Sequence, residues 1–315
     1  MKDSFNRTID YCRISVTDLC NFRCKYCMPD GVFKKKHDDI LSLEELKLIS
    51  DTLAMLGVHK QRITGGEPLI RKNVLSLIRN IGKNKLVDKL AITTNGSLLN
   101  IYAEELKQAG VTNLNISLDT LNPEVFGKIS SSGDLADTLK GIEKAKALKF
   151  DTLKLNCVLL KGINDCEINK LADFGKENGI PVRFIELMPF TNQQNYSNKY
   201  YTATSEIIAK YDLTAVPVND VTDKVRYYRF PNGGIIGFIS PVSDKFCRYC
   251  NRIRITADGK LLNCLHENKE YDLKPYLSNQ VLLADKIMEF VRQKPPCHSL
   301  REGKLQNREM DEIGG

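Results

Sequence analysis

The stretch Arg13-Ile-Ser-Val-Thr-Asp-Leu-Cys20-Asn-Phe-Arg-Cys24-Lys-Tyr-Cys27 joins a predicted strand to a loop that holds three cysteines. Polar residues at positions 13, 15 and 17 alternate with apolar residues at 14 and 16. This period of two is typical of a strand with one polar and one apolar face. We therefore expect the strand to deliver three thiols to one loop at its carboxyl end.

Three is an informative number of thiols. A four-iron cluster takes four ligands, so three cysteines leave one iron open to a reactant, as three-ligand catalytic zinc sites keep one position open. The alternative is a structural zinc site, although no fourth ligand is evident near the loop. Disulfides are not expected, because the chain opens with Met-Lys-Asp-Ser-Phe-Asn-Arg and shows no apolar signal stretch. We expect a cytoplasmic protein with reduced thiols.

Composition limits the remaining choices. The 315 residues, of which 42% are hydrophobic, are enough for one large core or one core plus a smaller unit. Apolar runs are far shorter than the roughly 18 residues of a membrane helix. The net charge of +7 favours anionic partners, such as a nucleoside triphosphate or a nucleic acid. Ten cysteines in such a chain indicate metal binding or redox chemistry.

Extended and helical patterns alternate from residue 13 to about residue 210. This order is typical of parallel sheets and barrels. One helix starts clearly, because Ser42 and Glu45 form a capping box ahead of apolar residues at helical spacing. The six predicted strands are 13–17, 60–64, 89–93, 113–119, 153–160 and 181–187.

Several of these strands carry a polar face. Asn113, Asn115, Ser117 and Asp119 share one face of their strand, and basic residues occupy the same face of others. Closed barrels normally fill their interior with branched apolar side chains, so polar inward faces predict a lumen that holds a polar ligand. The alternative is a solvent-facing antiparallel sheet. Strand 181–187 does not alternate cleanly, and the facing of Arg183 stays undecided.

The pattern changes after residue 210. Strands 224–230 and 235–239 flank a Pro-Asn-Gly-Gly turn, strands 252–256 and 260–262 flank an Ala-Asp-Gly turn, and a helix follows at 280–293. We expect a separate β-rich unit here. The predicted domains are a partial barrel at 8–215 and a unit for a second cluster and substrate binding at 216–315.

A second group of three cysteines lies in that unit. Cys247 and Cys250 are separated by two residues, and Cys264 follows beyond a predicted turn. His266 offers a fourth zinc ligand, so zinc and an iron–sulfur cluster both remain open on ligand types alone. Four cysteines are left over as unligated thiols: Cys12, Cys157, Cys166 and Cys297.

The first cysteine loop resembles that of radical S-adenosylmethionine enzymes. The second group, followed by Asn251-Arg-Ile-Arg254, resembles the carboxy-terminal cluster loop of the GTP 3′,8-cyclase family of molybdenum-cofactor biosynthesis. The resemblance spans nearly the whole chain. It includes Arg62-Ile-Thr-Gly-Gly-Glu-Pro68, Thr93-Thr-Asn-Gly96, Asn115-Ile-Ser-Leu-Asp119, Lys161-Gly-Ile-Asn-Asp165, Arg183-Phe-Ile-Glu-Leu-Met188 and the terminal Gly314-Gly315.

This resemblance implies an α/β fold, an incomplete parallel (β/α)6 barrel closed by the β-rich unit. It implies two [4Fe-4S] clusters, one held by Cys20, Cys24 and Cys27 and the other by Cys247, Cys250 and Cys264. It implies contacts to S-adenosylmethionine from Tyr26, Gly66, Ser117 and Met188, although Met188 alone would suggest core packing. Contacts to GTP are implied for Arg13, Arg62, Thr93, Lys154, Arg252 and Arg254. Catalytic roles are implied for Arg252, Arg254, Gly314 and Gly315, the last two in a tail that reaches the active site.

The activity implied is conversion of GTP to 3′,8-cyclo-7,8-dihydro-GTP by a 5′-deoxyadenosyl radical. Expected partners are an electron donor such as flavodoxin or ferredoxin, and cyclic pyranopterin monophosphate synthase as the next enzyme, with a homodimer as one candidate assembly. One alternative function is a radical enzyme that modifies a peptide. Another is a basic zinc-binding or electron-transfer protein that interacts with nucleic acid. For each arginine, the alternative to a contact with GTP is a surface ion pair. For the Gly-Gly tail, the alternative to a place in the active site is disorder.

Overall fold

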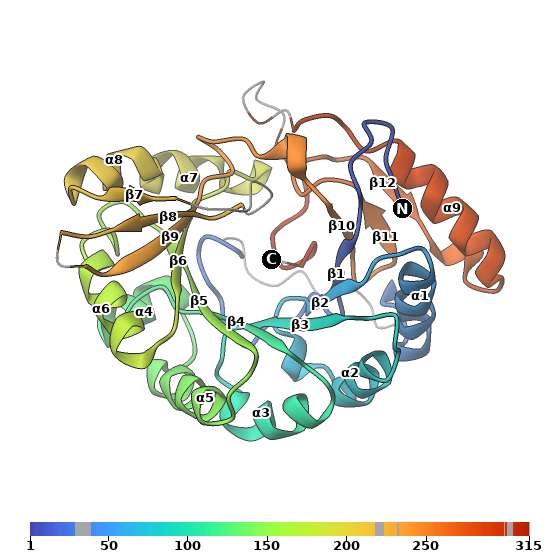
Figure 1. Ribbon diagram of the computed structural model, residues 1–315, viewed down its shortest axis with the longest axis horizontal. Coiled ribbons are helices and arrows are strands. Elements are labelled where there is room, and N and C mark those ends of the chain that lie inside the picture. Colours follow the sequence, from blue (N-terminus) through green and yellow to red (C-terminus); the bar gives the residue numbers. More distant parts are fainter. Residues whose placement is uncertain (29–38, 218–223, 232, 299, 301–304, 315) are drawn as a thin grey trace.

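Six parallel strands form an open arc, as the sequence predicts (Figure 1). The structure, a computed structural model, describes residues 1–28, 39–217, 224–231, 233–298, 300 and 305–314. Each strand of the arc pairs in parallel with the next along the chain. The strands are β1 (Tyr11–Ser15), β2 (Lys60–Thr64), β3 (Lys89–Thr94), β4 (Asn113–Ser117), β5 (Thr152–Leu159) and β6 (Val182–Glu186). Parallel pairing excludes the antiparallel sheet that the polar faces left open.

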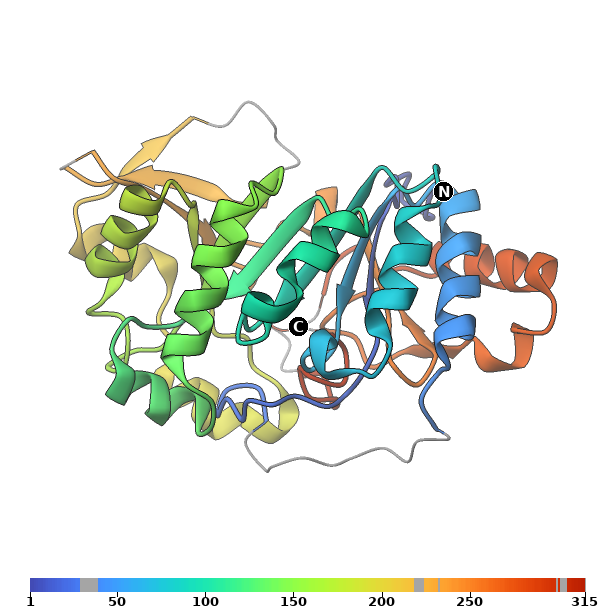
Figure 2. The same ribbon diagram turned by 90° about the horizontal axis from the view of Figure 1, so that it is seen from below.

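Helices cover the outer side of the arc (Figure 2). The capping box predicted at Ser42 and Glu45 is present at the start of α1, whose apolar face is buried against the sheet. Within the described ranges, no helix is both long enough and apolar enough to cross a membrane. The helices are α1 (Leu43–Met55), α2 (Val74–Gly82), α3 (Leu99–Gln108), α4 (Pro123–Ser130), α5 (Leu135–Ala147), α6 (Ile168–Asn178), α7 (Gln194–Tyr200), α8 (Thr204–Lys210) and α9 (Gln280–Arg292).

The carboxy-terminal strands extend the same sheet at both of its edges. Strand β10 pairs in parallel with β1, and β9 pairs in parallel with β6. The sheet has twelve strands in the order β12-β11-β10-β1-β2-β3-β4-β5-β6-β9-β8-β7, and its two ends do not pair. The added strands are β7 (Thr214–Val216), β8 (Arg226–Arg229), β9 (Ile235–Ile239), β10 (Arg252–Ile255), β11 (Lys260–Leu262) and β12 (Glu270–Asp272).

The carboxy-terminal strands, which the sequence predicts as a β-rich unit, pair with both edges of the six-strand arc. Each edge of an open arc presents unpaired backbone N–H and C=O groups, which the later strands satisfy. Strand β7 spans the predicted boundary between residues 215 and 216. The division into units 8–215 and 216–315 stays a prediction, but the sheet itself runs through both.

The two faces of the strands have different environments. Apolar side chains such as Ile14, Ile63 and Leu114 are fully buried between the sheet and the helices. On β6, Val182 and Phe184 belong to this buried layer, whereas Arg183 and Ile185 line the interior. The facing of the sixth strand, undecided from sequence, is therefore inward for Arg183.

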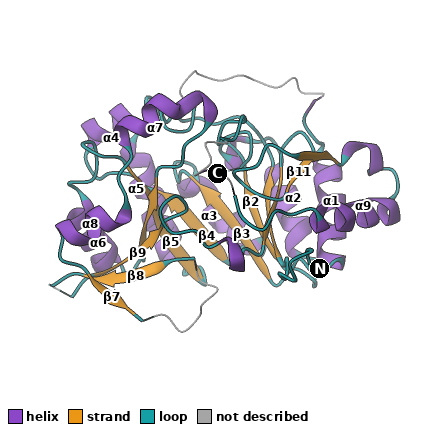
Figure 3. Cartoon of the chain, turned by 90° about the horizontal axis from the view of Figure 1, so that it is seen from above, coloured by secondary structure: helices purple, strands orange, loops and turns teal. Residues whose placement is uncertain are grey.

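The chain ends inside the arc (Figures 1 and 3). Ile313 is fully buried and packs with Phe190, which follows β6, and with Leu262 of β11. Ile313 and Met310 thus anchor the end of the chain in the interior. Gly315 lies outside the described residues.

Candidate functional site

Both cysteine groups open onto one cavity of about 630 Å³ inside the arc. Its wall is formed by the inward faces of β1 to β6 together with residues of the carboxy-terminal strands. This is the lumen that the polar strand faces predict. The cysteines that line it are Cys20, Cys24, Cys27, Cys247, Cys250 and Cys264.

The loop of the first cysteine group is held against the loop that follows β2. The Gly66 N–H donates to Thr17 O at 2.8 Å, and the Glu67 N–H donates to Leu19 O at 2.8 Å. A Cβ at Gly66 would lie 2.3 Å from Leu19 O, so only glycine permits this approach. The Gly-Gly-Glu-Pro motif therefore fixes the position of the cysteine loop.

The donor set of this loop fits an iron–sulfur cluster. Burial raises the pKa of Cys20 to about 11, and it raises the pKa of Cys24 and Cys27 as well. Free thiolates are thus disfavoured here unless a positive group joins them, and a coordinating metal deprotonates its thiols outright. Three such thiols provide three of the four ligands of a [4Fe-4S] cluster.

The residues expected to contact S-adenosylmethionine gather beside this loop. Tyr26, Gly66, Ser117 and Met188 all line the cavity. The Tyr26 Oη donates to Asp119 Oδ2 at 2.7 Å, which ties the cysteine loop to the end of β4. Asp119 was noted only as part of the polar strand face, and burial raises its pKa to about 6. It positions Tyr26 and closes this side of the cavity.

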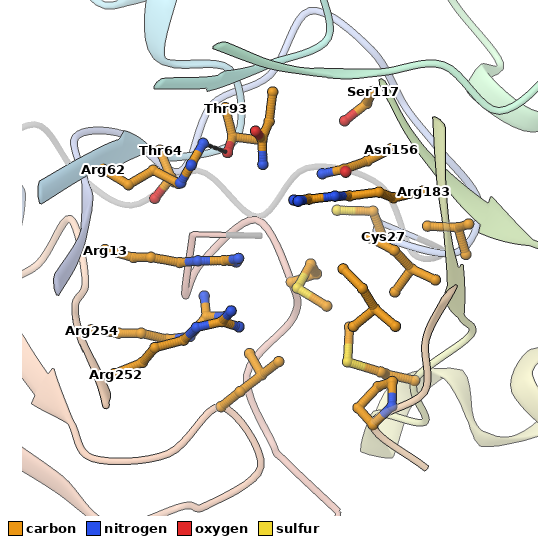
Figure 4. A pocket seen from close by; sticks show the side chains of 18 of the residues that line it. Arg13, Cys27, Arg62, Thr64, Thr93, Ser117, Asn156, Arg183, Arg252 and Arg254 are labelled. Atoms are coloured by element: carbon orange, nitrogen blue, oxygen red, sulfur yellow. Dashed lines mark hydrogen bonds between the residues drawn. The ribbon is translucent and has the colours of Figure 1, made fainter. Parts of the chain in front are cut away.

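The residues expected to contact GTP line the same cavity. Arg13, Arg62, Thr93 and Lys154 lie on β1, β2, β3 and β5, and Arg252 and Arg254 lie on β10. Figure 4 shows the side chains of Arg13, Arg252 and Arg254 pointing the same way, as expected from the pairing of Arg13 with Arg254 in the sheet. The structure thus brings all six predicted contacts together.

Several arginine side chains of the cavity have buried hydrogen-bond donors without acceptors. Burial and the neighbouring Arg13 lower the pKa of Arg252 to about 10, and they hold the pKa of Arg254 well below its ordinary value. The Nε atoms of Arg13, Arg183 and Arg252 are buried with no hydrogen-bond partner. Buried cations and donors without partners cost several kcal/mol, roughly 1–3 kcal/mol for each donor alone, unless a ligand supplies acceptors. The cavity is built for a polyanion.

Tyr11 and Lys224 also line the cavity and were not predicted as site residues. The Arg62 Nε donates to Tyr11 Oη at 2.5 Å, and Arg252 lies 5.5 Å from the centre of the Tyr11 ring. Burial alone would raise the pKa of Tyr11, but the nearby arginines lower it to about 7. Tyr11 lies two residues before Arg13 and shares the inward face of β1. The alternation of this strand could therefore have identified Tyr11 as a cavity residue. Nothing in the sequence pattern marks Lys224.

The second cysteine group lies in a cationic environment. Burial opposes ionisation of Cys250, but Lys294, Lys224 and Arg252 together lower its pKa to about 7. This favours the thiolate form that metal binding requires. His266, the candidate zinc ligand, is 5% exposed, and both ring nitrogens lack a partner. In the part of the chain that the structure describes, no three His, Cys, Asp or Glu side chains are gathered closely enough to hold a single ion.

A buried carboxylate fixes the loop that leads to Cys247. Glu186 is fully buried and accepts from the N–H groups of Val242 and Ser243 at 3.1 and 2.9 Å, and from the Thr204 N–H at 3.1 Å. The carboxylate therefore joins the end of β6, the start of α8 and the segment after β9. It holds the approach to the second cysteine group in place.

Replacing Glu186 with glutamine is expected to destabilise the protein by about 1–3 kcal/mol, because one amide oxygen cannot accept all these bonds and buried N–H groups lose their partners. Chemical denaturation measures this change. Glu105→Gln is the matched control, since Glu105 is 49% exposed and its ion pair with Arg79 spans 3.7 Å. Equal unfolding midpoints for the two variants would show that Glu186 has no such role.

The tail is held by Arg254, a residue of the cavity wall. Its Nη1 donates to Ile313 O at 3.2 Å and to Gly314 O. Gly314 has a φ of +71°, and a Cβ there would lie 2.3 Å from Thr64 Oγ1. Both features require glycine at this position. Gly315, the other predicted tail residue, lies outside the described residues.

Comparisons with known proteins agree with this geometry. A family model of the Radical SAM superfamily matches residues 14–175, and one of Molybdenum Cofactor Synthesis C matches residues 180–300. The GTP 3′,8-cyclase of Alkaliphilus metalliredigens is 44% identical over 320 residues, covering 100% of both chains. That of Peptoclostridium acidaminophilum is 43% identical over 317 residues, covering 99% of this chain and 98% of the relative.

Solved structures show the same fold. Native anSMEcpe with bound AdoMet has a TM-score of 0.62 at 14% identity, over 94% of this chain and 82% of that one. Streptococcus suis SuiB bound to S-adenosylmethionine has a TM-score of 0.59 at 16% identity, over 91% and 66%. On the strength of the family models and of relatives that match along its whole length, the chain belongs to the GTP 3′,8-cyclase family of the radical S-adenosylmethionine superfamily.

Proposed function

We propose that this protein converts GTP to (8S)-3′,8-cyclo-7,8-dihydroguanosine 5′-triphosphate, the first step of molybdopterin cofactor biosynthesis. The observation that carries the proposal is the cavity that both three-cysteine groups line together with arginines, of which Arg13, Arg183 and Arg252 have a buried Nε without a hydrogen-bond partner. Membership of the superfamily implies a [4Fe-4S] cluster and S-adenosylmethionine as cofactors. The second cluster, at Cys247, Cys250 and Cys264, is part of this proposal.

The reaction depends on how the residues of the chain hold the reactants. When bound, the cofactors would supply a 5′-deoxyadenosyl radical able to take the C3′ hydrogen of GTP, and closure of the C3′–C8 bond would then need one electron and one proton to reach the 7,8-dihydro product. Tyr26, Gly66, Ser117 and Met188 hold S-adenosylmethionine beside the first cysteine loop. The cations on β1, β2, β5 and β10 bind the triphosphate and fix C3′ in reach of the radical.

The charge of the cavity supports a triphosphate as the bound group. A triphosphate carries up to about four negative charges and many acceptor oxygens, which match guanidinium donors well. Arg183, whose facing the sequence left undecided, adds another cation to the cavity. Its Nη2 donates to the Tyr227 Oη at 3.2 Å, and its Nε has no hydrogen-bond partner. Lys154, Arg183 and the arginines of β1 and β10 thus surround the space left for the substrate.

An Arg183→Met variant is expected to bind GTP about tenfold more weakly, because one charge-assisted hydrogen bond is lost. S-adenosylmethionine affinity should stay unchanged. Isothermal titration of both ligands under anaerobic conditions measures these effects. Arg229→Met on strand β8 is the control, since Arg229 is exposed. Equal GTP affinity in both variants would remove Arg183 from the binding site.

The proposed activity is tested by anaerobic incubation of the reconstituted protein with GTP, S-adenosylmethionine and a reductant, followed by mass analysis. We expect 5′-deoxyadenosine and a cyclised nucleotide in equal amounts, and about eight iron atoms per chain. Cofactor cleavage without any GTP-derived product would refute the proposal. Cleavage stimulated by a peptide but not by GTP would favour the peptide-modifying alternative.

The proposal includes the other expected partners. An electron donor such as flavodoxin or ferredoxin would reduce the first cluster, and cyclic pyranopterin monophosphate synthase would consume the product. Cytoplasmic location and a homodimer remain predictions of the same kind.

A further inference from the structure

One of the leftover cysteines lies against a member of the second cysteine group. Cys297 is exposed, whereas Cys247 is partly buried and lines the cavity. The Cys297 side chain and the His298 backbone both lie close enough to Cys247 to influence the pKa of its thiol. The segment after α9 therefore places a solvent-accessible thiol in contact with a cysteine that the proposed function uses as a cluster ligand.

A clamp near the amino terminus holds this contact in place. The Arg7 Nη1 donates to Cys247 O at 2.9 Å and to Pro296 O at 3.1 Å, and its Nη2 donates to Pro295 O at 2.6 Å. The Arg7 Nε is held by Asp3 Oδ2 at 2.5 Å, and the side chains of Arg7 and Asp3 are 8% and 0% exposed. One buried guanidinium thus joins the backbones on both sides of the thiol pair.

We propose that Cys297 is the disulfide partner of Cys247 when the second cysteine group holds no cluster, so that oxidation of this pair blocks loading of that site. The loading step rests on the proposed function, but formation of the disulfide does not. Cys297 is the thiol that a small disulfide reaches first, because Cys247 is the more buried of the two.

The chemistry is two successive exchanges with oxidised glutathione. The Cys297 thiolate attacks one glutathione sulfur, which forms a mixed disulfide and releases one glutathione. The Cys247 thiolate then attacks the Cys297 sulfur and releases the second glutathione. The cysteine pair loses two electrons and two protons, and the glutathione disulfide gains both. A thiol reductant reverses the reaction.

The sequence makes the disulfide easy to map. Tryptic cleavage places the four relevant cysteines on different peptides: Cys247 on 246–248, Cys250 on 249–252, Cys264 on 261–269 and Cys297 on 293–301. Iron-free protein is incubated anaerobically with oxidised glutathione, free thiols are alkylated, and the digest is analysed by mass spectrometry. We expect 246–248 joined to 293–301 as the main linked pair of this group, with two glutathiones released per chain.

Two variants serve as controls. Cys297→Ser should remove the linked pair, whereas Cys166→Ser, which alters another exposed cysteine, should leave it unchanged. A main product joining Cys247 to Cys250 or Cys264, or a stable glutathione adduct on Cys297, would overturn the proposal.

A second experiment measures how much iron the protein binds after reconstitution. Oxidised wild-type protein reconstituted without a thiol reductant should bind about half the iron of reduced protein, and dithiothreitol should restore it. If the disulfide forms but iron uptake is unaffected, the link to loading is wrong. If reduced protein itself binds only one cluster, the two-cluster part of the proposed function fails while the disulfide result stands.

Discussion

A Gly314→Ala variant is expected to lose cyclisation about 100-fold or more while still cleaving S-adenosylmethionine. The left-handed backbone of Gly314 costs an alanine about 1–2 kcal/mol, and the contact of its Cβ with Thr64 Oγ1 adds about 1–3 kcal/mol of overpacking. This cost favours conformations in which the tail no longer lies beside Arg254. At about 1.4 kcal/mol for each factor of ten, the loss follows.

The measurement compares 5′-deoxyadenosine with cyclised nucleotide in the same reaction, together with iron content. Gly179→Ala is the matched control, because Gly179 has a φ of +67° but no atom within 4 Å of an added Cβ. It should cost some stability and leave the product ratio unchanged. Unchanged cyclisation by Gly314→Ala would show that the tail has no part in the reaction. Removal of Gly314 and Gly315 should give the same phenotype with both clusters intact.

Local patterns in the sequence predict the barrel and the inward face of several of its strands, whereas the roles of the site residues come from the family resemblance. The alternation in β1 and β4 identifies which residues face inward, and the structure places Arg13 and Ser117 on the cavity wall accordingly. Paired features such as the capping box at Ser42 are equally local. Because each of these signals is carried by neighbouring residues, the sequence alone is enough to interpret them.

Such local patterns do not predict contacts between segments that lie far apart in the chain. Hairpin signals identify β8 with β9 and β10 with β11, but they do not say which edge of the arc each hairpin joins. The packing of Arg252 on Tyr11 and the Arg7 clamp depend on that choice, since each joins a carboxy-terminal residue to a residue near the amino terminus. The resemblance predicted that the tail reaches the active site. Its contacts with Arg254 and Thr64 could be identified only from the structure.

Arg252 and Arg254 are expected to act differently although they lie two residues apart on β10. Alanine at either position should reduce cyclisation about 100-fold and affect cofactor cleavage less, because each removes a buried cation from the substrate cavity. Arg254 also holds the tail through Ile313 O and Gly314 O. Arg252 contacts the Tyr11 ring instead. Only Arg254 should therefore share its effect with Gly314.

A double-mutant cycle separates the two roles. Arg254→Ala combined with Gly314→Ala should lose little more than either single variant, because residues that act as a unit are not additive. Arg252→Ala combined with Gly314→Ala should lose about 10⁴-fold, the product of two independent effects of about 100-fold, and radiolabelled GTP makes such rates measurable. Equal losses of cofactor cleavage and cyclisation in Arg252→Ala or Arg254→Ala would argue against substrate positioning. Additive losses in both cycles would mean that Arg254 does not act through the tail, and its contact with Gly314 O would then be a matter of packing alone.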